Sequence, residues 1–221
     1  MLGQLTATVS HEIRNPLGTV ANSLYLLKES LEDEELKRLE RPLLLAERNV
    51  ERCDTIISDL LDFSRQRKIE KQLVNMDGWL RSFFAEIKIP QNIYLSTDFS
   101  ADRDVPIDVE RFRRVIVNVA TNAFQALEET EKENKVLTIK TKIVADRYII
   151  EFQDNGPGMS KDVLSHIYEP MFSTKNFGVG LGVPIIKNII ENHGGEVHYQ
   201  SREGEGTTVT VSLPLQASLQ S

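Results

Sequence analysis

The sequence predicts an all-α helical hairpin followed by an α+β domain. From Leu2 to Leu60, apolar residues recur at spacings of three and four, which is typical of helices packed against other helices. Beyond a charged stretch, paired segments of two-residue alternation lie between helical segments without a regular strand–helix–strand order, which is typical of an α/β sandwich with a mixed sheet. We therefore expect a helical domain at 1–68, a linker at 69–75, an α+β domain at 76–215 and a tail at 216–221.

Two helices make up the expected hairpin. The apolar seam of the first consists of Leu2, Leu5, Val9, Ile13, Leu17, Val20, Leu24, Leu27 and Leu31. After a polar turn at 32–35, the seam of the second consists of Leu36, Leu39, Leu43, Ala46, Val50, Cys53, Ile57 and Leu60. Pro42 suits this helix if it lies in the first turn. Two helices cannot bury both seams alone, whereas two hairpins related by a two-fold axis make a four-helix bundle, so we expect a homodimer through residues 1–68.

The stretch Ser10-His11-Glu12-Ile13-Arg14-Asn15-Pro16-Leu17-Gly18 lies inside the first expected helix. At about 100° per residue, His11 falls opposite the apolar seam, on the polar side of the helix. Pro16 donates no N–H, so the helix should bend just after His11. A solvated face with an incidental histidine is the simpler interpretation of a lone histidine. The adjacent Glu12, Asn15 one turn on and the proline together favour a reactive site.

The α+β domain follows with alternating helical and extended segments. We expect helices at 76–87, 109–127 and 181–192, and strands at 93–99, 136–144, 148–153, 196–200 and 207–213. Asp146 and Arg147 would form the turn between two of the paired strands.

Three polar residues interrupt the apolar helix expected at 109–127. Asn118, Asn122 and Gln125 share one stripe at spacings of four and three. A buried asparagine is costly unless its amide is hydrogen-bonded. A ligand or metal would satisfy these amides, and so would ordinary pairing with other side chains. The stripe alone does not distinguish the two.

Three glycine clusters follow in order. The first, Asp154–Met159, begins at a strand end, where an aspartate can accept hydrogen bonds from the amino group of a base. The second, Gly178–Pro184, leads into a helix whose unpaired N–H groups would suit phosphate. It follows no strand and lacks the lysine of a Walker loop, which excludes Rossmann and P-loop geometry. The third, Gly204–Thr208, opens the last strand. Each cluster is weak evidence alone, but their order is specific.

Composition excludes several classes of protein. The chain of 221 residues is 40% hydrophobic and 27% charged, which suits folded domains with a core. With 33 acidic against 26 basic residues and a net charge of −7, a nucleic-acid partner is not indicated. Cys53 is the single cysteine, so no intramolecular disulfide forms, and a reducing compartment is expected.

Membrane and export segments are also not indicated. No apolar run approaches the about 18 to 20 residues of a membrane span, and no signal peptide is recognisable, so we expect a cytoplasmic location. The first helix is in register at Leu2 without a capping residue before it. We therefore expect the protein to continue upstream, where any sensor or membrane anchor would lie.

The motifs in this order closely resemble the catalytic core of the two-component sensor histidine kinases. The matching segments are Ser10–Leu17 with their phospho-acceptor box, Asn118–Ala126 with their asparagine box, Asp154–Gly158 with their first glycine box, Tyr168–Phe172 with their phenylalanine box, and Gly178–Gly182 and Gly204–Thr207 with their later glycine boxes. The resemblance covers nearly all of the chain. It implies a dimeric phospho-acceptor bundle and an ATP-binding domain of the gyrase, chaperone and histidine kinase type.

The resemblance also implies an activity, which is autophosphorylation of His11 from ATP followed by transfer to an aspartate on the receiver domain of a response regulator. Neutral His11 would be the nucleophile, and Glu12 would orient it and remove its ring proton. Arg14 would offset phosphate charge. In this family, a polar residue at the position of Asn15 positions water for dephosphorylating the regulator, so the resemblance implies phosphatase activity too.

In the ATP-binding domain, the resemblance implies a nucleotide site. Asn122 would ligate Mg²⁺ through its amide oxygen, supported by Asn118, and Asp154 would bind the adenine amino group. Residues 159–177 would form a short lid. The remaining nucleotide contacts would come from Gln125, Gly156, Gly158, Lys175, Gly178, Gly180, Leu181, Gly182 and Thr207. For Lys175, a plain solvated lysine is the competing interpretation.

The sequence departs from the common family pattern in places. Gln125 stands where many members carry a basic residue, which puts that phosphate contact in doubt. Tyr168 replaces the usual phenylalanine, and Pro184 begins the helix after the glycine loop, where a first-turn proline is compatible with the fold. The other three histidines are expected to be structural or surface residues; they are His166, His193 and His198.

Two other functions compete with this assignment. ATP hydrolases with the same nucleotide fold use a glutamate where this chain has Asn118, because water needs a general base that an amide cannot supply. A pseudokinase scaffold would bind ATP without transferring phosphate, and the intact His11, Glu12 and Asn122 argue against it. The input signal, the regulator partner and the choice between phosphorylation within or between subunits stay open.

Overall fold

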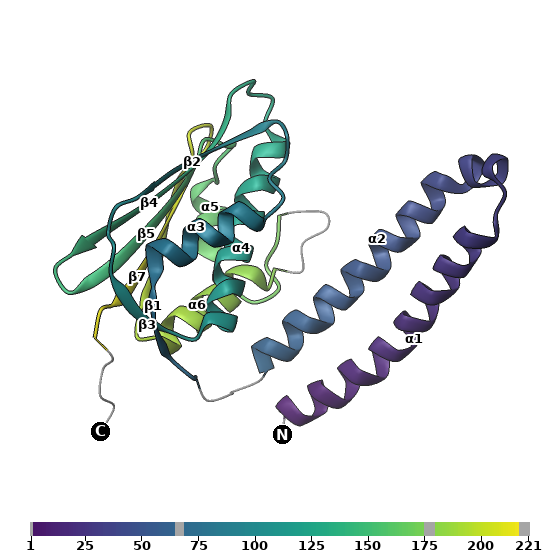
Figure 1. Ribbon diagram of the computed structural model, residues 1–221, viewed down its shortest axis with the longest axis horizontal. Coiled ribbons are helices and arrows are strands. Elements are labelled where there is room, and N and C mark those ends of the chain that lie inside the picture. Colours follow the sequence, from purple (N-terminus) through teal and green to yellow (C-terminus); the bar gives the residue numbers. More distant parts are fainter. Residues whose placement is uncertain (1, 65–68, 175–179, 217–221) are drawn as a thin grey trace. The chain divides into compact units, whose positions relative to one another are not determined.

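The computed structural model describes residues 2–64, 69–174 and 180–216, with side chains in the first helix from Ile13 onward (Figure 1). The chain divides into two compact units, 1–67 and 68–221. None of the described helices is long and apolar enough to cross a bilayer.

The first unit is a helical hairpin of α1 (Leu2–Ser30) and α2 (Asp33–Ser64). Lys28 bonds Glu47 at 3.0 Å, and Arg14 bonds Asp54 at 2.6 Å, so the helices run antiparallel. α1 continues as a helix through Pro16.

The turn of the hairpin is shorter than we expected. α2 begins at Asp33 rather than after Glu35, because acidic residues suit the positive end of a helix. Pro42 therefore lies inside α2 and not in its first turn, so this expectation was wrong. Since proline lacks an N–H, Pro42 cannot donate the usual helical hydrogen bond to the carbonyl of Arg38.

The second unit combines a mixed sheet with helices on one of its faces (Figure 1). Its elements are β1 (Gln72–Asn75), α3 (Met76–Glu86), β2 (Ile93–Phe99), β3 (Asp104–Ile107), α4 (Val109–Glu129), β4 (Lys135–Val144), β5 (Arg147–Asp154), α5 (Lys161–His166), α6 (Gly182–Asn192), β6 (Glu196–Arg202) and β7 (Gly206–Pro214). The large sheet has the order β2-β4-β5-β7-β6, in which β2 and β4 are parallel and the other pairs antiparallel.

A small second sheet corrects the expected linker. Residues 72–75, which we placed in a linker, form β1 and pair antiparallel with β3. β3 was not predicted either, since a strand of four residues has little periodicity of its own and is defined by its partner. α5 also lies within the segment 159–177 that we expected to act as a lid.

The core lies between the large sheet and helices α3, α4 and α6. Strand residues Ile139, Ile150 and Val211 and helix residues Phe112 and Ile186 are fully buried. Along β4, exposed Lys140 and Lys142 alternate with buried residues, so the other face of the sheet is polar. The fold is the predicted α/β sandwich.

A buried carboxylate fastens α3 to the sheet. Asp77 accepts hydrogen bonds from the hydroxyl groups of Tyr148 and of Thr141, the latter at 2.9 Å, and from the backbone N–H of Asp102 at 2.8 Å. Burial by itself would raise the pKa of Asp77. Hydrogen bonds from Tyr148, Asp102 and Thr141 outweigh burial and hold that pKa below its ordinary value, so the carboxylate is charged and fully bonded.

Candidate functional site

The two asparagines of α4 lie at the border of its buried face. Asp108 caps the helix by accepting from the N–H of Arg111 at 3.2 Å. Val119 and Ala123 face the core, whereas Asn118 and Asn122 are half-buried. Neither amide is hydrogen-bonded to another residue that the structure describes. Pairing with neighbouring side chains is thus not seen in the described part of the chain, and the amides are open to a ligand.

The start of α6 lies directly against these amides. A Cβ atom added to Gly182 would stand 3.5 Å from Oδ1 of Asn118 and 3.8 Å from Nδ2 of Asn122. The N-cap residue is Leu181, whose buried side chain offers no acceptor to the first N–H groups. The first N–H groups of α6 thus have no side-chain cap among the described residues, and they lie beside two asparagine amides, an arrangement that suits phosphate oxygens. Pro184 lies in the first turn of α6, as the sequence predicted.

Asp154 ends β5 and is 7% exposed. Its Oδ1 accepts from the backbone N–H groups of Gly156 at 2.9 Å and Thr207 at 3.3 Å. Burial raises the pKa of Asp154, and these two hydrogen bonds offset part of that rise. Since both bonds end on Oδ1, Oδ2 is the oxygen that can accept from an amino group of a ligand.

Glycine is required where the loops meet Asp154. Gly206 has φ +120°, and a Cβ there would stand 2.1 Å from the carbonyl oxygen of Asp154. A Cβ on Gly156 would stand 3.4 Å from the backbone of Ala126, near the end of α4. Gly156 and Gly206 therefore lie against Asp154, and Gly156 also lies against the helix that carries the asparagines. Gly158 lies against the third cluster, because a Cβ there would stand 3.1 Å from the carbonyl oxygen of Gly206.

The phenylalanine-box segment meets the second glycine cluster. Gly180 has φ +71°, and its carbonyl accepts from the N–H of Met171 at 3.0 Å. The hydroxyl of Tyr168 donates to the carbonyl of Val197 at 3.2 Å, so tyrosine is accommodated here. Lys175 and Gly178 lie outside the described residues. Gln125 is exposed on α4.

The predicted phospho-acceptor stretch lies on α1. His11 and Glu12 are helical in backbone, and their side chains lie outside the described residues. Asn15 is exposed. Arg14 forms an ion pair with Asp54 of α2, so its charge is shared within the hairpin. The sequence did not point to Asp54, because this partner lies forty positions away.

One lysine near the site was not predicted from the sequence. Lys132 donates to the carbonyl oxygens of Asn155 at 2.8 Å and Gly204 at 3.0 Å, which ties two glycine clusters together. It stands in the polar run Glu131-Lys132-Glu133-Asn134, which resembles an ordinary surface loop. Nothing local in the sequence distinguishes it from a solvated lysine.

Family comparisons define the class of protein. Residues 107–217 match the histidine kinase-, DNA gyrase B- and HSP90-like ATPases, and residues 1–68 match the His kinase A phospho-acceptor domain. Such a chain joins a phospho-acceptor domain to a nucleotide-binding domain. It belongs to the two-component sensor histidine kinases and comprises their catalytic core, which confirms the resemblance seen in the sequence.

Individual relatives agree with this assignment. The chain is 30% identical to sporulation kinase D of Bacillus subtilis over 99% of its own length and 43% of that protein. It is 30% identical to sensor protein kinase PilS of Pseudomonas aeruginosa, covering 96% of the chain and 40% of PilS. The chain thus spans less than half of these relatives.

Solved structures share the fold. Histidine kinase ThkA, in complex with response regulator protein TrrA, matches with a TM-score of 0.71 and 26% identity over 99% of this chain and 63% of that one. Full-length ShkA in complex with AMPPNP matches with a TM-score of 0.80 and 23% identity over 99% of this chain and 47% of that one, which is a likeness of fold alone.

Proposed function

We propose that this chain transfers the γ-phosphoryl group of ATP to His11, and from there to an aspartate on the receiver domain of a response regulator. The observation that carries the proposal is the meeting of Asn118, Asn122 and the start of α6, with a buried aspartate on the adjoining strand end. The match of residues 1–68 to the His kinase A phospho-acceptor domain also supports the proposal.

Nucleotide recognition would divide between two groups. Oδ2 of Asp154 would accept from the adenine amino group, because both backbone bonds occupy Oδ1. The N–H groups at the start of α6, which no described side chain caps, would bind phosphate oxygens, with Gly182 allowing close approach.

The half-buried amides fit a Mg²⁺ ion, since amide oxygens are hard donors. Asn122 would hold the ion and Asn118 would support it. Among the described residues, no group of three or more Asp, Glu, His or Cys side chains converges as a metal site. Further ligands would therefore be phosphate oxygens and water, and Mg²⁺ bound there would neutralise phosphate charge during transfer.

At the phospho-acceptor, neutral His11 would attack the γ-phosphorus through one ring nitrogen. The nitrogen–phosphorus bond forms as the bond to the β–γ bridging oxygen breaks, and ADP leaves with that electron pair. Glu12, the next residue, would take the proton from the ring. In the phosphatase reaction, Asn15 would position water for dephosphorylation of the regulator.

A homodimer through residues 1–68 would bury the exposed apolar side chains of the hairpin. Val20, Leu27, Leu39, Leu44 and Leu45 are each exposed in the single chain, which is the apolar surface that a four-helix bundle would cover. The reaction would take place in the cytoplasm, where ATP is supplied and where the single cysteine would stay reduced.

The proposal is tested by incubating the chain with γ-labelled ATP and Mg²⁺. We expect an acid-labile, base-stable label that is absent from His11→Gln. Label that persists in His11→Gln would overturn the assignment of the nucleophile. Nucleotide binding without any label in the wild type would mean a binding module.

A further inference from the structure

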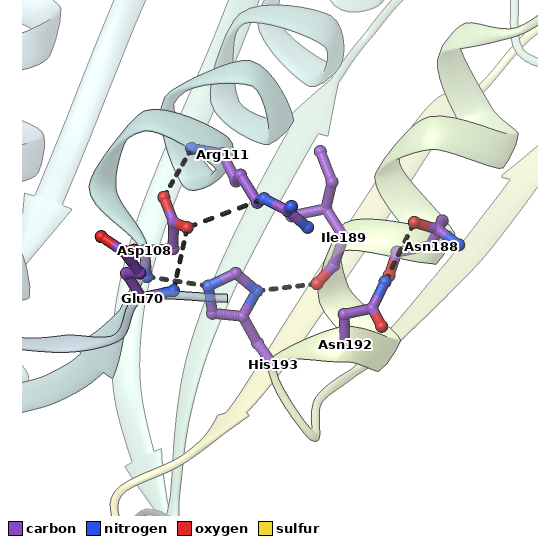
Figure 2. A network of polar contacts seen from close by, with 7 residues as sticks. All are labelled: Glu70, Asp108, Arg111, Asn188, Ile189, Asn192 and His193. Atoms are coloured by element: carbon purple, nitrogen blue, oxygen red, sulfur yellow. Dashed lines mark hydrogen bonds and ion pairs between the residues drawn. The ribbon is translucent and has the colours of Figure 1, made fainter. Parts of the chain in front are cut away.

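A polar network joins the start of the α+β unit to one end of the α4/α6 helix pair (Figure 2). The helices run in opposite directions, because Asp108 before α4 contacts His193 after α6, while Gly182 at the start of α6 lies beside Asn118. The candidate ATP site thus occupies one end of the pair and the polar network the other. Along α6, the two ends are about 16 Å apart at 1.5 Å per residue.

His193 bridges the two helices through both ring nitrogens. Nδ1 lies 2.7 Å from the carbonyl oxygen of Ile189, and Nε2 lies 2.9 Å from the backbone N of Asp108. The carbonyl can only accept and the N–H can only donate, so the ring must be neutral with its proton on Nδ1. The side chain is buried, and the ring lies edge-on to Phe112.

Two consecutive residues after the hairpin bond to this bridge. The N–H of Glu70 donates to Oδ2 of Asp108 at 3.3 Å, while Oδ1 of Asp108 caps α4 (Figure 2). Nζ of Lys71 donates to the carbonyl oxygen of His193 at 3.0 Å. Glu70 is thus held by the start of α4, and Lys71 by the end of α6. We call Glu70, Lys71, Asp108 and His193 the latch.

We infer that the latch fixes where the connection from the hairpin joins the α+β unit, and that Asp108 and His193 are positioning residues for phosphorylation of His11. α2 ends at Ser64, so six peptide steps separate it from Glu70. Six steps span at most about 22 Å, and releasing the latch would lengthen this connection. The inference rests on the proposed function, because it concerns how the ATP site reaches its histidine.

Matched substitutions test the hydrogen bonds of the latch while keeping those that cap α4 and end α6. Asp108→Asn keeps one oxygen for the cap but turns an NH₂ group toward the N–H of Glu70, and it also removes the ion pair of Oδ2 with Nε of Arg111 at 3.6 Å. His193→Asn places an amide near Nδ1, so it keeps the bond to Ile189 but cannot reach Asp108. His193→Gln places its amide oxygen near Nε2 and so restores the bridge. Glu70→Gln is the control, because the latch uses only the backbone of that residue.

The experiment measures three quantities on the full chain. They are affinity for a fluorescent ATP analogue, the rate of histidine phosphorylation at saturating ATP and Mg²⁺, and residue-resolved amide exchange by NMR. We expect faster amide exchange at Glu70 in Asp108→Asn and faster amide exchange at Asp108 in His193→Asn. In both variants, phosphorylation of His11 should be slower by about threefold or more, because the reacting groups lose alignment. Nucleotide affinity should stay within about twofold, and His193→Gln and Glu70→Gln should behave as wild type.

Each contrary result has its own meaning. Faster exchange with an unchanged phosphorylation rate would overturn the positioning role. Affinity and rate that fall together would show a purely structural role for the network. Equal exchange in wild type and variants would mean that the latch does not exist. A wild type that binds nucleotide but carries no label would overturn the proposed function and the positioning role together, while the exchange data would still decide whether the latch forms.

Discussion

At the scale of single residues, the site depends on groups whose bonding is incomplete within the described protein. Oδ1 of Asp154 is occupied by two N–H groups, and this leaves Oδ2 for a ligand. The amides of Asn118 and Asn122 make no hydrogen bond within the described part of the chain, although both are half-buried. Asp77, in contrast, is fully bonded and belongs to the core. Incomplete bonding, rather than burial alone, distinguishes the candidate ligand groups.

Asp154→Asn should separate nucleotide recognition from folding. The amide oxygen can still accept from Gly156 and Thr207, but the NH₂ group then faces the adenine amino group, which also donates. We expect ATP affinity to fall by about 10- to 100-fold, as for loss of a hydrogen bond to a charged group. Thermal stability should not decrease, because burial already disfavours the charged carboxylate and raises its pKa. Isothermal titration and thermal unfolding measure the two effects, and unchanged ATP affinity would contradict the assigned role.

At the scale of elements, the sequence predicted those with strong patterns of their own. α4 and α6 were predicted from helical spacing, and β4 and β5 from paired alternation. β1 and β3 were missed, because each has four residues and depends on pairing with the other. Pro42 was misplaced because helix ends are the least certain feature of a sequence pattern. Lys132 and Asp54 were missed because their partners come from distant parts of the chain.

Tyr148→Phe tests how α3 is held on the sheet. The substitution removes a hydroxyl donor from the buried carboxylate of Asp77. We expect the free energy of unfolding to fall by about 1–3 kcal/mol near neutral pH. The pKa of Asp77 is lowered in the folded state, so its contribution is present above the ordinary value of 3.8 and is lost as pH falls through the folded pKa. The loss of unfolding free energy on acidification should therefore be smaller in the variant than in the wild type. Denaturant unfolding at several pH values would measure this difference.

Acidification should also weaken the latch through His193. Burial lowers the pKa of this imidazole below its ordinary value of 6.5, and the facing charges are Lys71 and Arg111, which lower it, and Asp108, which raises it. A lowered folded pKa means that the unfolded chain binds the proton first, so stability is present above about pH 6.5 and is lost as pH falls toward the folded pKa. His193→Gln should remove this part of the pH dependence. If the free energy of unfolding fell equally steeply below pH 6.5 in the variant and the wild type, His193 would not be the source of this pH dependence.

At the scale of the whole molecule, each unit accounts for one half of the proposed reaction. The hairpin carries His11, and the α+β unit carries the candidate nucleotide groups. The sequence identified both halves through ordered motifs. It could not show the latch, because Glu70, Asp108 and His193 are far apart in the chain and look like ordinary surface or helix-end residues.

Val20→Glu tests the proposed dimer. Val20 is 47% exposed on α1 and belongs to the apolar seam, so a charge there should oppose burial in a four-helix bundle. We expect the wild-type chain to sediment as a dimer and the variant to shift toward monomer, while exposed Asn22→Glu serves as the control on the same helix. A wild-type chain that sediments as a monomer would contradict the four-helix bundle.

Whether His11 is the phosphorylated residue is decided by mapping which residue carries phosphate after incubation with ATP and Mg²⁺. Peptide mapping under alkaline conditions preserves phosphohistidine and locates the label. We expect label on His11, and its loss in Asn122→Ala with the fold intact. Label on any other residue, or undiminished label in Asn122→Ala, would contradict it.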